Sequence, residues 1–199
     1  MIVLPMQSHH CYQIAKLHME NLNSNFQGNS GLHLLKVYYH AIIVSNGACG
    51  FIAQRDNRVI GFICGVWDSR NVQDTMFKYH FLEIIKWAFV HVIIHPQCMI
   101  DLIRRVGGRK EIFYTENGYE LRPIVISPRE RGSGVGTTLV RNLIGDAAQR
   151  GYKSIYLYTE KGNLLANSLY HKIGFDRKKE FHSQGRDYIY YEYQISNIQ

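Results

Sequence analysis

The sequence has few residues that cross-link or interrupt a chain, with four cysteines and four prolines among 199 residues. No two cysteines are close enough to form the paired spacing of a metal or redox site, and no Asn-x-Ser/Thr glycosylation signal occurs. We therefore expect free, structural thiols in a reducing cytoplasm. The start of the sequence lacks the charged and apolar segments of a signal peptide, which favours the same location.

Long apolar and basic runs are also missing. No stretch reaches the roughly 18 uncharged apolar residues of a membrane span, so stable membrane insertion is not expected. The formal net charge of +7 suits an anionic ligand, and simple solubility explains it equally well. No basic run reaches five residues, which argues against a nucleic-acid partner. A chain of 199 residues is expected to form a single domain over residues 1–199.

Hydrophobic periodicity predicts an α/β or α+β domain built on one mixed sheet. Strands are expected at 1–5, 119–127, 154–159 and 186–195, and helices at 9–22 and 31–45. Residues 48–67 read as a hairpin, with Asp56-Asn57 at its turn.

A helical insert is expected over residues 71–107, with a break near Pro96. Its segment MFKYHFLEIIKWAFVHVII is apolar nearly all round, which favours deep packing in the core. A homodimer contact, a wall of an acceptor pocket and a membrane-surface contact are weaker alternatives. His91 and His95 have the spacing of a zinc pair, but they lack a third ligand, so no metal is expected.

The segment RGSGVG at 131–136 lies between a predicted strand and a predicted helix. Glycine permits positive φ and a close approach to a ligand, and the start of a helix presents unpaired N–H groups that favour anions. The loop therefore predicts a phosphate cradle. A P-loop would require a lysine after Gly136, where Thr137 stands. A Rossmann loop would place its third glycine one residue later, and too few residues follow Glu160 for the rest of that fold.

The segments after the loop carry clear helix signals. The apolar face of the first helix is formed by Val135, Leu139, Val140, Leu143, Ile144, Ala147 and Ala148. Gly151 is expected to end this helix. A second helix is expected over 163–173, with Asn163 as its N-cap and Gly174 at its end.

Two motifs in this region resemble those of the GNAT superfamily of N-acetyltransferases. The segment ISPRERGSGVGTTLVRNLI is similar to the acetyl-CoA-binding motif of that family, with Arg131, Gly134 and Gly136 at the matching positions. A second pattern, similar to an element found downstream in the family, is formed by Asn163, Ala166, Tyr170, Gly174 and Phe175. The resemblance is clear over 111–195 and weaker over 1–70, and residues 71–107 have no counterpart in it.

This resemblance implies a mostly antiparallel central sheet, splayed at the cofactor, with helices on both faces. It also implies acetyl-CoA as co-substrate. The loop contacts would come from Arg131, Gly132, Ser133, Gly134, Val135, Gly136 and Thr137. Ile124, Val125 and Ile126 would bind the pantetheine arm along a strand edge, with Asn163 and Tyr170 nearby.

The implied reaction is direct acetyl transfer to a primary amine, which must lose a proton. Glu120, at the start of the strand leading to the loop, is the first candidate base. His80, His91 and His95 are weaker alternatives. Tyr170 would protonate the departing thiolate, and a backbone N–H of residues 124–126 would hold the oxyanion.

The acceptor is expected to be a small molecule such as an amino sugar. A peptide amine and a non-catalytic acyl-CoA-binding module remain alternatives.

Overall fold

The computed structural model of the chain describes residues 1–22, 28–94, 118–183 and 185–195. These residues form one sheet with the strand order β1-β2-β3-β4-β5-β7-β6. Neighbouring strands are antiparallel except β4 and β5, which are parallel. The strands are β1 (Ile2–Pro5), β2 (Ala48–Arg55), β3 (Arg58–Val66), β4 (Tyr119–Ile126), β5 (Ser154–Glu160), β6 (Asp176–Ser183) and β7 (Arg186–Gln194). The predicted mixed, mostly antiparallel sheet is confirmed.

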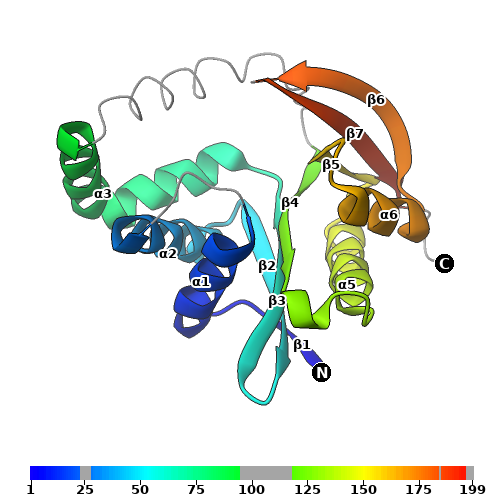
Figure 1. Ribbon diagram of the computed structural model, residues 1–199, viewed down its shortest axis with the longest axis horizontal. Helices are drawn as coiled ribbons and strands as arrows, with labels where there is room; N and C mark the ends of the chain where they lie inside the picture. Colours follow the sequence, from blue (N-terminus) through cyan, green and yellow to red (C-terminus); the bar gives the residue numbers. More distant parts are fainter. Residues whose placement is uncertain (23–27, 95–117, 184, 196–199) are drawn as a thin grey trace.

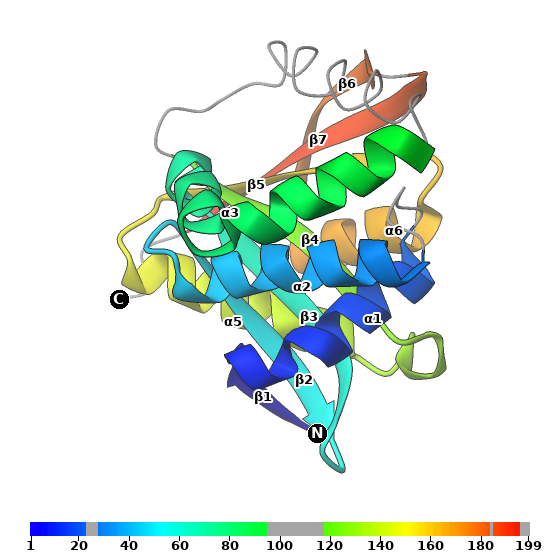
Figure 2. The same cartoon turned by 90° about the vertical axis from the view of Figure 1, so that its left-hand side faces the viewer.

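Helices cover both faces of the sheet, as predicted (Figures 1 and 2). On one face lie η1 (Ser8–His10), α1 (Cys11–Asn21) and α2 (Gly28–Val44), with α3 (Ser69–Ile94) packed on α2. On the other face lie α5 (Val135–Gln149) and α6 (Leu164–Ile173), and the short η3 (Pro128–Glu130) follows β4. Each face has its own apolar core, one beneath α1 and α2 and one beneath α5 and α6.

The predicted turn and helix-end signals are found in place. Asp56 and Asn57 have φ of 48° and 59°, the left-handed pair of a two-residue hairpin turn. Gly151, with φ of +80°, follows the end of α5, and Gly174, with φ of +102°, ends α6. The Asn163 side chain accepts a hydrogen bond from a backbone N–H in the first turn of α6 at 3.2 Å. These elements follow from local sequence alone.

The apolar face predicted for the helix after the loop is the packed face of α5. Val135, Leu139, Val140, Leu143 and Ala147 are buried, and Ile144 and Ala148 are half-buried. This face packs against β2, β3 and β4, so it fixes the start of α5 relative to the end of β4.

β4 leaves β5 almost as soon as the two strands meet. Only Tyr119 and Glu120 of β4 have partners in β5, namely Ile155 and Tyr156. β3, by contrast, stays paired with β4 as far as Ile126. We call the point after Glu120, where β4 and β5 stop pairing, the fork. The splayed strands implied by the resemblance are therefore present.

A β-bulge at Pro123 lies just beyond the fork. Ile63 of β3 is opposite Ile124, and the next residue, Cys64, is opposite Arg122, so Pro123 has no partner in the ladder. Proline has no N–H to donate, which suits this position. The extra residue shifts the alternation of side chains along β4. Arg122, before the bulge, faces the layer of α3, whereas Ile124 and Ile126, after it, face the core under α5 and α6.

The helical insert differs from its prediction in bounds and in packing. α3 begins at Ser69 and is bent at His80, whose φ of −133° and ψ of 21° leave the helical region. Residues 95–107, with the expected break at Pro96, lie outside the described residues. Phe81 and Leu82 are 53% and 70% exposed, because only one side of α3 packs on α2. The expectation of deep core packing is wrong for these side chains.

A polar cluster fastens α5 to the sheet. The Asp146 carboxylate accepts hydrogen bonds from Tyr119 Oη at 2.8 Å and from Arg150 Nε at 2.7 Å. The Trp67 ring stacks on the Tyr119 ring, with centroids 5.4 Å apart, and its centroid lies 4.1 Å from Arg150 Cζ. Burial opposes the ionisation of Asp146, but the hydrogen bonds from Arg150 and Tyr119 outweigh it and lower the pKa of the carboxyl.

We expect Asp146→Asn to reduce the free energy of unfolding near pH 7 by about 1–3 kcal/mol, because neighbouring donors lose a charged acceptor. Since the folded-state pKa of Asp146 is lowered, this difference should shrink as the pH falls below about 3.9, the value for aspartate in an unfolded chain. Urea unfolding at a series of pH values measures it, with the exposed Asp74→Asn as control. A difference that does not depend on pH would contradict the assignment.

Candidate active site

The glycine loop passes through two left-handed residues before α5 begins. Gly132 and Gly134 have φ of +78° and +86°, a region that costs most other residues about 1–2 kcal/mol. A Cβ atom at either position would meet no heavy atom within 4 Å, so the backbone there is open to a ligand. Gly134 is the N-cap of α5, and its carbonyl accepts the first helical hydrogen bond from Thr138 N–H at 3.0 Å.

The next N–H groups are the main binding feature of the loop. Within the described part of the chain, the backbone N–H groups of Gly134, Val135, Gly136 and Thr137 donate to no protein acceptor. They belong to the N-cap and first turn of α5, where the helix dipole adds partial positive charge. This arrangement fits a diphosphate, as the sequence predicts.

Gly136 differs from the two glycines before it. It lies within α5, and a Cβ atom there would come within 3.2 Å of Leu169 Cδ2 in α6. The missing side chain therefore lets α5 and α6 approach closely. The contact predicted for Gly136 with the cofactor rests on its N–H group alone.

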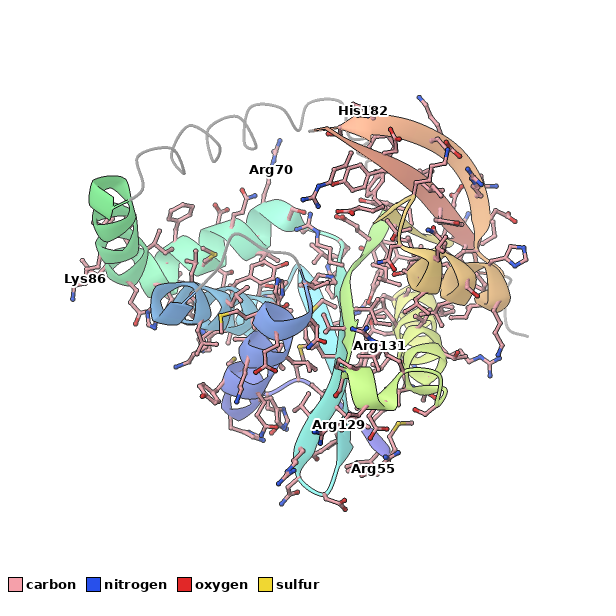
Figure 3. The ribbon with its side chains drawn as sticks, viewed as in Figure 1. Arg55, Arg70, Lys86, Arg129, Arg131 and His182 are labelled. Atoms are coloured by element: carbon pink, nitrogen blue, oxygen red, sulfur yellow. The ribbon has the colours of Figure 1, made fainter. Side chains whose placement is uncertain are left out.

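Arg131 links the loop to two other elements. Its Nε donates to Ile126 O of β4 at 3.4 Å, and its Nη2 donates to Asn21 Oδ1 of α1 at 3.3 Å. Figure 3 shows Arg131 between α1 and α5. Ser133 Oγ donates to Glu130 O at 2.6 Å, which tightens the turn. Arg131 remains exposed, so its cation is available to an anion bound at the loop.

The edge of β4 beyond the fork offers further backbone groups. Ser127 N–H donates to Ile60 O of β3 at 2.9 Å. Because an antiparallel ladder bonds alternate residues, the peptide groups of Val125 also face β3, whereas those of Ile124 and Ile126 face away from it. Of the three residues predicted to meet the pantetheine arm, Ile124 and Ile126 therefore direct backbone groups into the fork, and Val125 does not.

Glu120 stands at the fork itself, on the last residue of β4 that pairs with β5. Its side chain is 19% exposed, and Oε2 accepts a hydrogen bond from Arg122 Nε at 2.8 Å. Arg122 also donates from Nη2 to Ser69 Oγ, at the start of α3, at 2.8 Å. Arg122 is a site residue that the sequence analysis missed. Its spacing of two from Glu120, on one face of a strand, is the signal that could have indicated the pair.

The Tyr170 ring is buried in the core under α6. Its centroid lies 5.5 Å from that of Phe175 and 5.9 Å from that of Tyr191, and burial raises the pKa of its hydroxyl. Tyr170 is 4% exposed, and its hydroxyl donates to none of the residues that the structure describes. It is a protonated phenol at neutral pH with a hydrogen to donate.

Glu120 and Tyr170 belong to opposite faces of the sheet. Through Arg122, the Glu120 carboxylate connects to the first turn of α3, whereas Tyr170 lies in the core beneath α5 and α6. A reacting group held between β4 and β5 would therefore have the carboxylate on one side and the phenol on the other.

Asn163 divides its groups between two tasks. Its Oδ1 caps α6, and its backbone N–H donates to Glu160 O at 2.9 Å. Its side-chain N–H group donates to none of the residues that the structure describes. This group is the part of Asn163 that a pantetheine amide could engage.

The alternative bases lie elsewhere or outside the described residues. His80 Nδ1 is 2.7 Å from Glu83 Oε2, and its Nε2 is 2.9 Å from His40 Nδ1, at the contact of α2 with α3. The side chain of His91 and the whole of His95 lie outside the described residues. In the described ranges, no group of three His, Cys, Asp or Glu residues is arranged to hold a metal ion. None of the helices there combines the length and the apolar character that crossing a membrane requires.

Comparisons with known proteins agree with this geometry. The model of the acetyltransferase (GNAT) family matches residues 13–175. The uncharacterized N-acetyltransferase YobR of Bacillus subtilis is 42% identical over 62 residues, which cover 31% of this chain and 25% of YobR. The mycothiol acetyltransferase of Kocuria rhizophila is 34% identical over 58 residues, which cover 29% of this chain and 19% of that protein. The matched segments thus span a quarter or less of these two relatives.

The fold also matches solved structures. An aminoglycoside 6′-N-acetyltransferase complexed with coenzyme A superposes with a TM-score of 0.63, covering 98% of both chains at 15% identity. At this identity, the likeness concerns the fold.

We expect Gly134→Glu to weaken coenzyme A binding by about 100-fold or more, because the substitution strains a left-handed residue and puts a carboxylate where the diphosphate would lie. Titration calorimetry measures the affinity. Asparagine tolerates the same φ and carries no charge, so the affinity of Gly134→Asn for coenzyme A should stay within about ten-fold of the original. Gly145→Glu, which adds the same charge at an open position of α5, should bind as the unaltered protein does. Unchanged affinity in Gly134→Glu would refute the cradle.

Proposed function

The chain belongs to the GNAT family of acetyltransferases, and from this premise we propose that it transfers the acetyl group of acetyl-CoA to a primary amine of a small molecule. The observation that carries the proposal is that two open backbone surfaces follow each other in the chain. Unpaired N–H groups at the start of α5 suit the diphosphate, and the outward N–H and C=O of Ile124 with the N–H of Ile126 suit the amides of the pantetheine arm.

The side chains at the fork supply the remaining chemistry. Glu120 would accept the proton that the ammonium must lose before its nitrogen can attack the acetyl carbonyl carbon. An N–H group of Ile124 or Ile126 would donate to the carbonyl oxygen as it becomes negative. As the carbon–sulfur bond breaks, the Tyr170 hydroxyl would give its proton to the sulfur, and solvent would restore it.

An amino sugar is the acceptor class that we favour. The fold matches an enzyme named for acetylating aminoglycosides, which supports this choice by analogy of fold. A peptide amine is the alternative acceptor. A non-catalytic acyl-CoA-binding module would keep the loop and β4 edge without using Glu120 and Tyr170. We place the activity in the cytoplasm, and the exposed apolar side chains of α3, such as Phe81, suit a homodimer contact.

A thiol-release assay tests the proposal directly. Purified protein, acetyl-CoA and a panel of kanamycin, glucosamine, spermidine and a peptide with a free N-terminus should release thiol with at least one amine. Mass spectrometry should then find the amine heavier by one acetyl group. Coenzyme A binding without thiol release from any panel member would favour the binding module.

Tyr170→Phe should lower kcat and leave the affinity for coenzyme A nearly unchanged, because it removes one hydroxyl and no binding group. General acid catalysis contributes about 10²–10⁴-fold, which sets the scale of the expected loss. Tyr191→Phe is the matched control. It also removes one hydroxyl from a ring in the same core, and that hydroxyl donates to Asn167 Oδ1. Equal turnover in Tyr170→Phe and the unaltered enzyme would exclude Tyr170 as the acid.

A further inference from the structure

Arg122 is a largely buried cation next to the fork. Its side chain is 23% exposed, and a guanidinium that has lost its hydration is stable only where other groups match its donors. Three such groups come from different elements. Glu120 Oε2 of β4 and Ser69 Oγ of α3 each lie at 2.8 Å, and the Tyr38 hydroxyl of α2 also hydrogen-bonds the guanidinium.

The backbone positions of this pair are set independently of the ion pair. β3 holds both residues in register, with Val66 opposite Glu120 and Cys64 opposite Arg122. Pairing with β3 fixes the Cα atoms but leaves the rotamer of a glutamate side chain undetermined. The contact that orients the Glu120 carboxylate is therefore the one from Arg122 Nε.

The ion pair also leaves half of the carboxylate open. Oε2 accepts the hydrogen bond from Arg122, whereas Oε1 accepts none from any residue that the structure describes. A general base needs an oxygen within reach of the proton that it removes, and an oxygen already holding a cation is poorly suited to that task. The two oxygens of Glu120 therefore differ: Oε2 is bound to Arg122, and Oε1 is open to a proton.

We propose that Arg122 is a positioning residue that holds the Glu120 carboxylate so that Oε1 receives the proton of the acceptor amine. The inference rests on the proposed function, because it requires Glu120 to be the base. Ser69 completes the arrangement by tying the guanidinium to the first turn of α3. The orientation of the base is thereby coupled to the position of this helix.

Three titratable groups close to this ion pair, Tyr38, Cys64 and Tyr158, carry no charge at neutral pH. Burial is the main cause that raises the pKa of Tyr38 of α2 and of Tyr158 of β5, and the negative charge of Glu120 adds to it. Burial also raises the pKa of the Cys64 thiol, opposite Arg122. Arg122 is thus the charged group in contact with the Glu120 carboxylate, at 2.8 Å.

The test compares kcat and KM for the unaltered enzyme and two variants, using acetyl-CoA and the best amine of the panel. Arg122→Gln should lower kcat by about ten-fold or more, a share of what general base catalysis supplies. Arg122→Lys keeps the charge but cannot contact Glu120 and Ser69 at the same time, so kcat should fall in this variant as well.

Two further measurements separate positioning from plain stability. The KM for acetyl-CoA should change by less than about three-fold in both variants, since the loop is untouched. Arg141→Gln is the matched control. It removes an arginine from the exposed side of α5, on the other face of the sheet, and should leave kcat and KM unchanged.

An Arg122→Gln enzyme that loses thermal stability but keeps kcat would overturn the inference. If Arg122→Gln does not fold, unchanged kcat in both Arg122→Lys and Ser69→Ala would overturn it equally. An unaltered enzyme that binds no coenzyme A, or releases no thiol with any amine, removes the proposed function itself. Normal activity with unaffected Arg122 variants removes only the role of Arg122.

Discussion

The parting of β4 from β5 after Glu120 is the constraint on which the rest of the structure depends. A strand within a sheet ordinarily pairs on both sides, and unpaired N–H and C=O groups away from water are unfavourable. Here β4 keeps β3 on one side, and the bulge at Pro123 lies where β5 has already departed. The N–H and C=O of Ile124 and the N–H of Ile126 are therefore left for a ligand that can pair as a strand does, while the Ile126 carbonyl accepts a hydrogen bond from Arg131.

The second binding surface follows from the first because they are consecutive in the chain. β4 ends at Ile126, and the short turn through η3 and the glycine loop leads directly into α5. The buried face of α5, from Val135 onward, packs back on β2, β3 and β4. The N–H groups at the start of this helix are thus held at a fixed distance from the open edge of β4. An extended ligand with a diphosphate at one end and amides along its length matches that order.

Sequence predicted the features of this chain that are local. The hairpin turn at Asp56, the N-cap at Asn163 and the buried face of α5 depend on neighbouring residues alone, and the structure has them in place. The fork was expected only because the family resemblance implies it. The order and pairing of strands depend on residues far apart in the sequence, so local patterns do not predict them. Arg122 was missed because its role depends on where α3 begins. The packing of α3 was misjudged because an apolar sequence does not specify which of its faces is covered.

The two residues that end the β4–β5 pairing also anchor the helices of both layers. Tyr119 reaches to one face and donates to Asp146 of α5, while Glu120 reaches to the other and connects through Arg122 to Ser69 of α3. Side-chain hydrogen bonds thus stabilise β4 at the position where its ladder with β5 stops. A rigid fork follows from this double anchoring. It allows the proposed base and acid from different layers, Glu120 and Tyr170, to keep one relative position without touching each other.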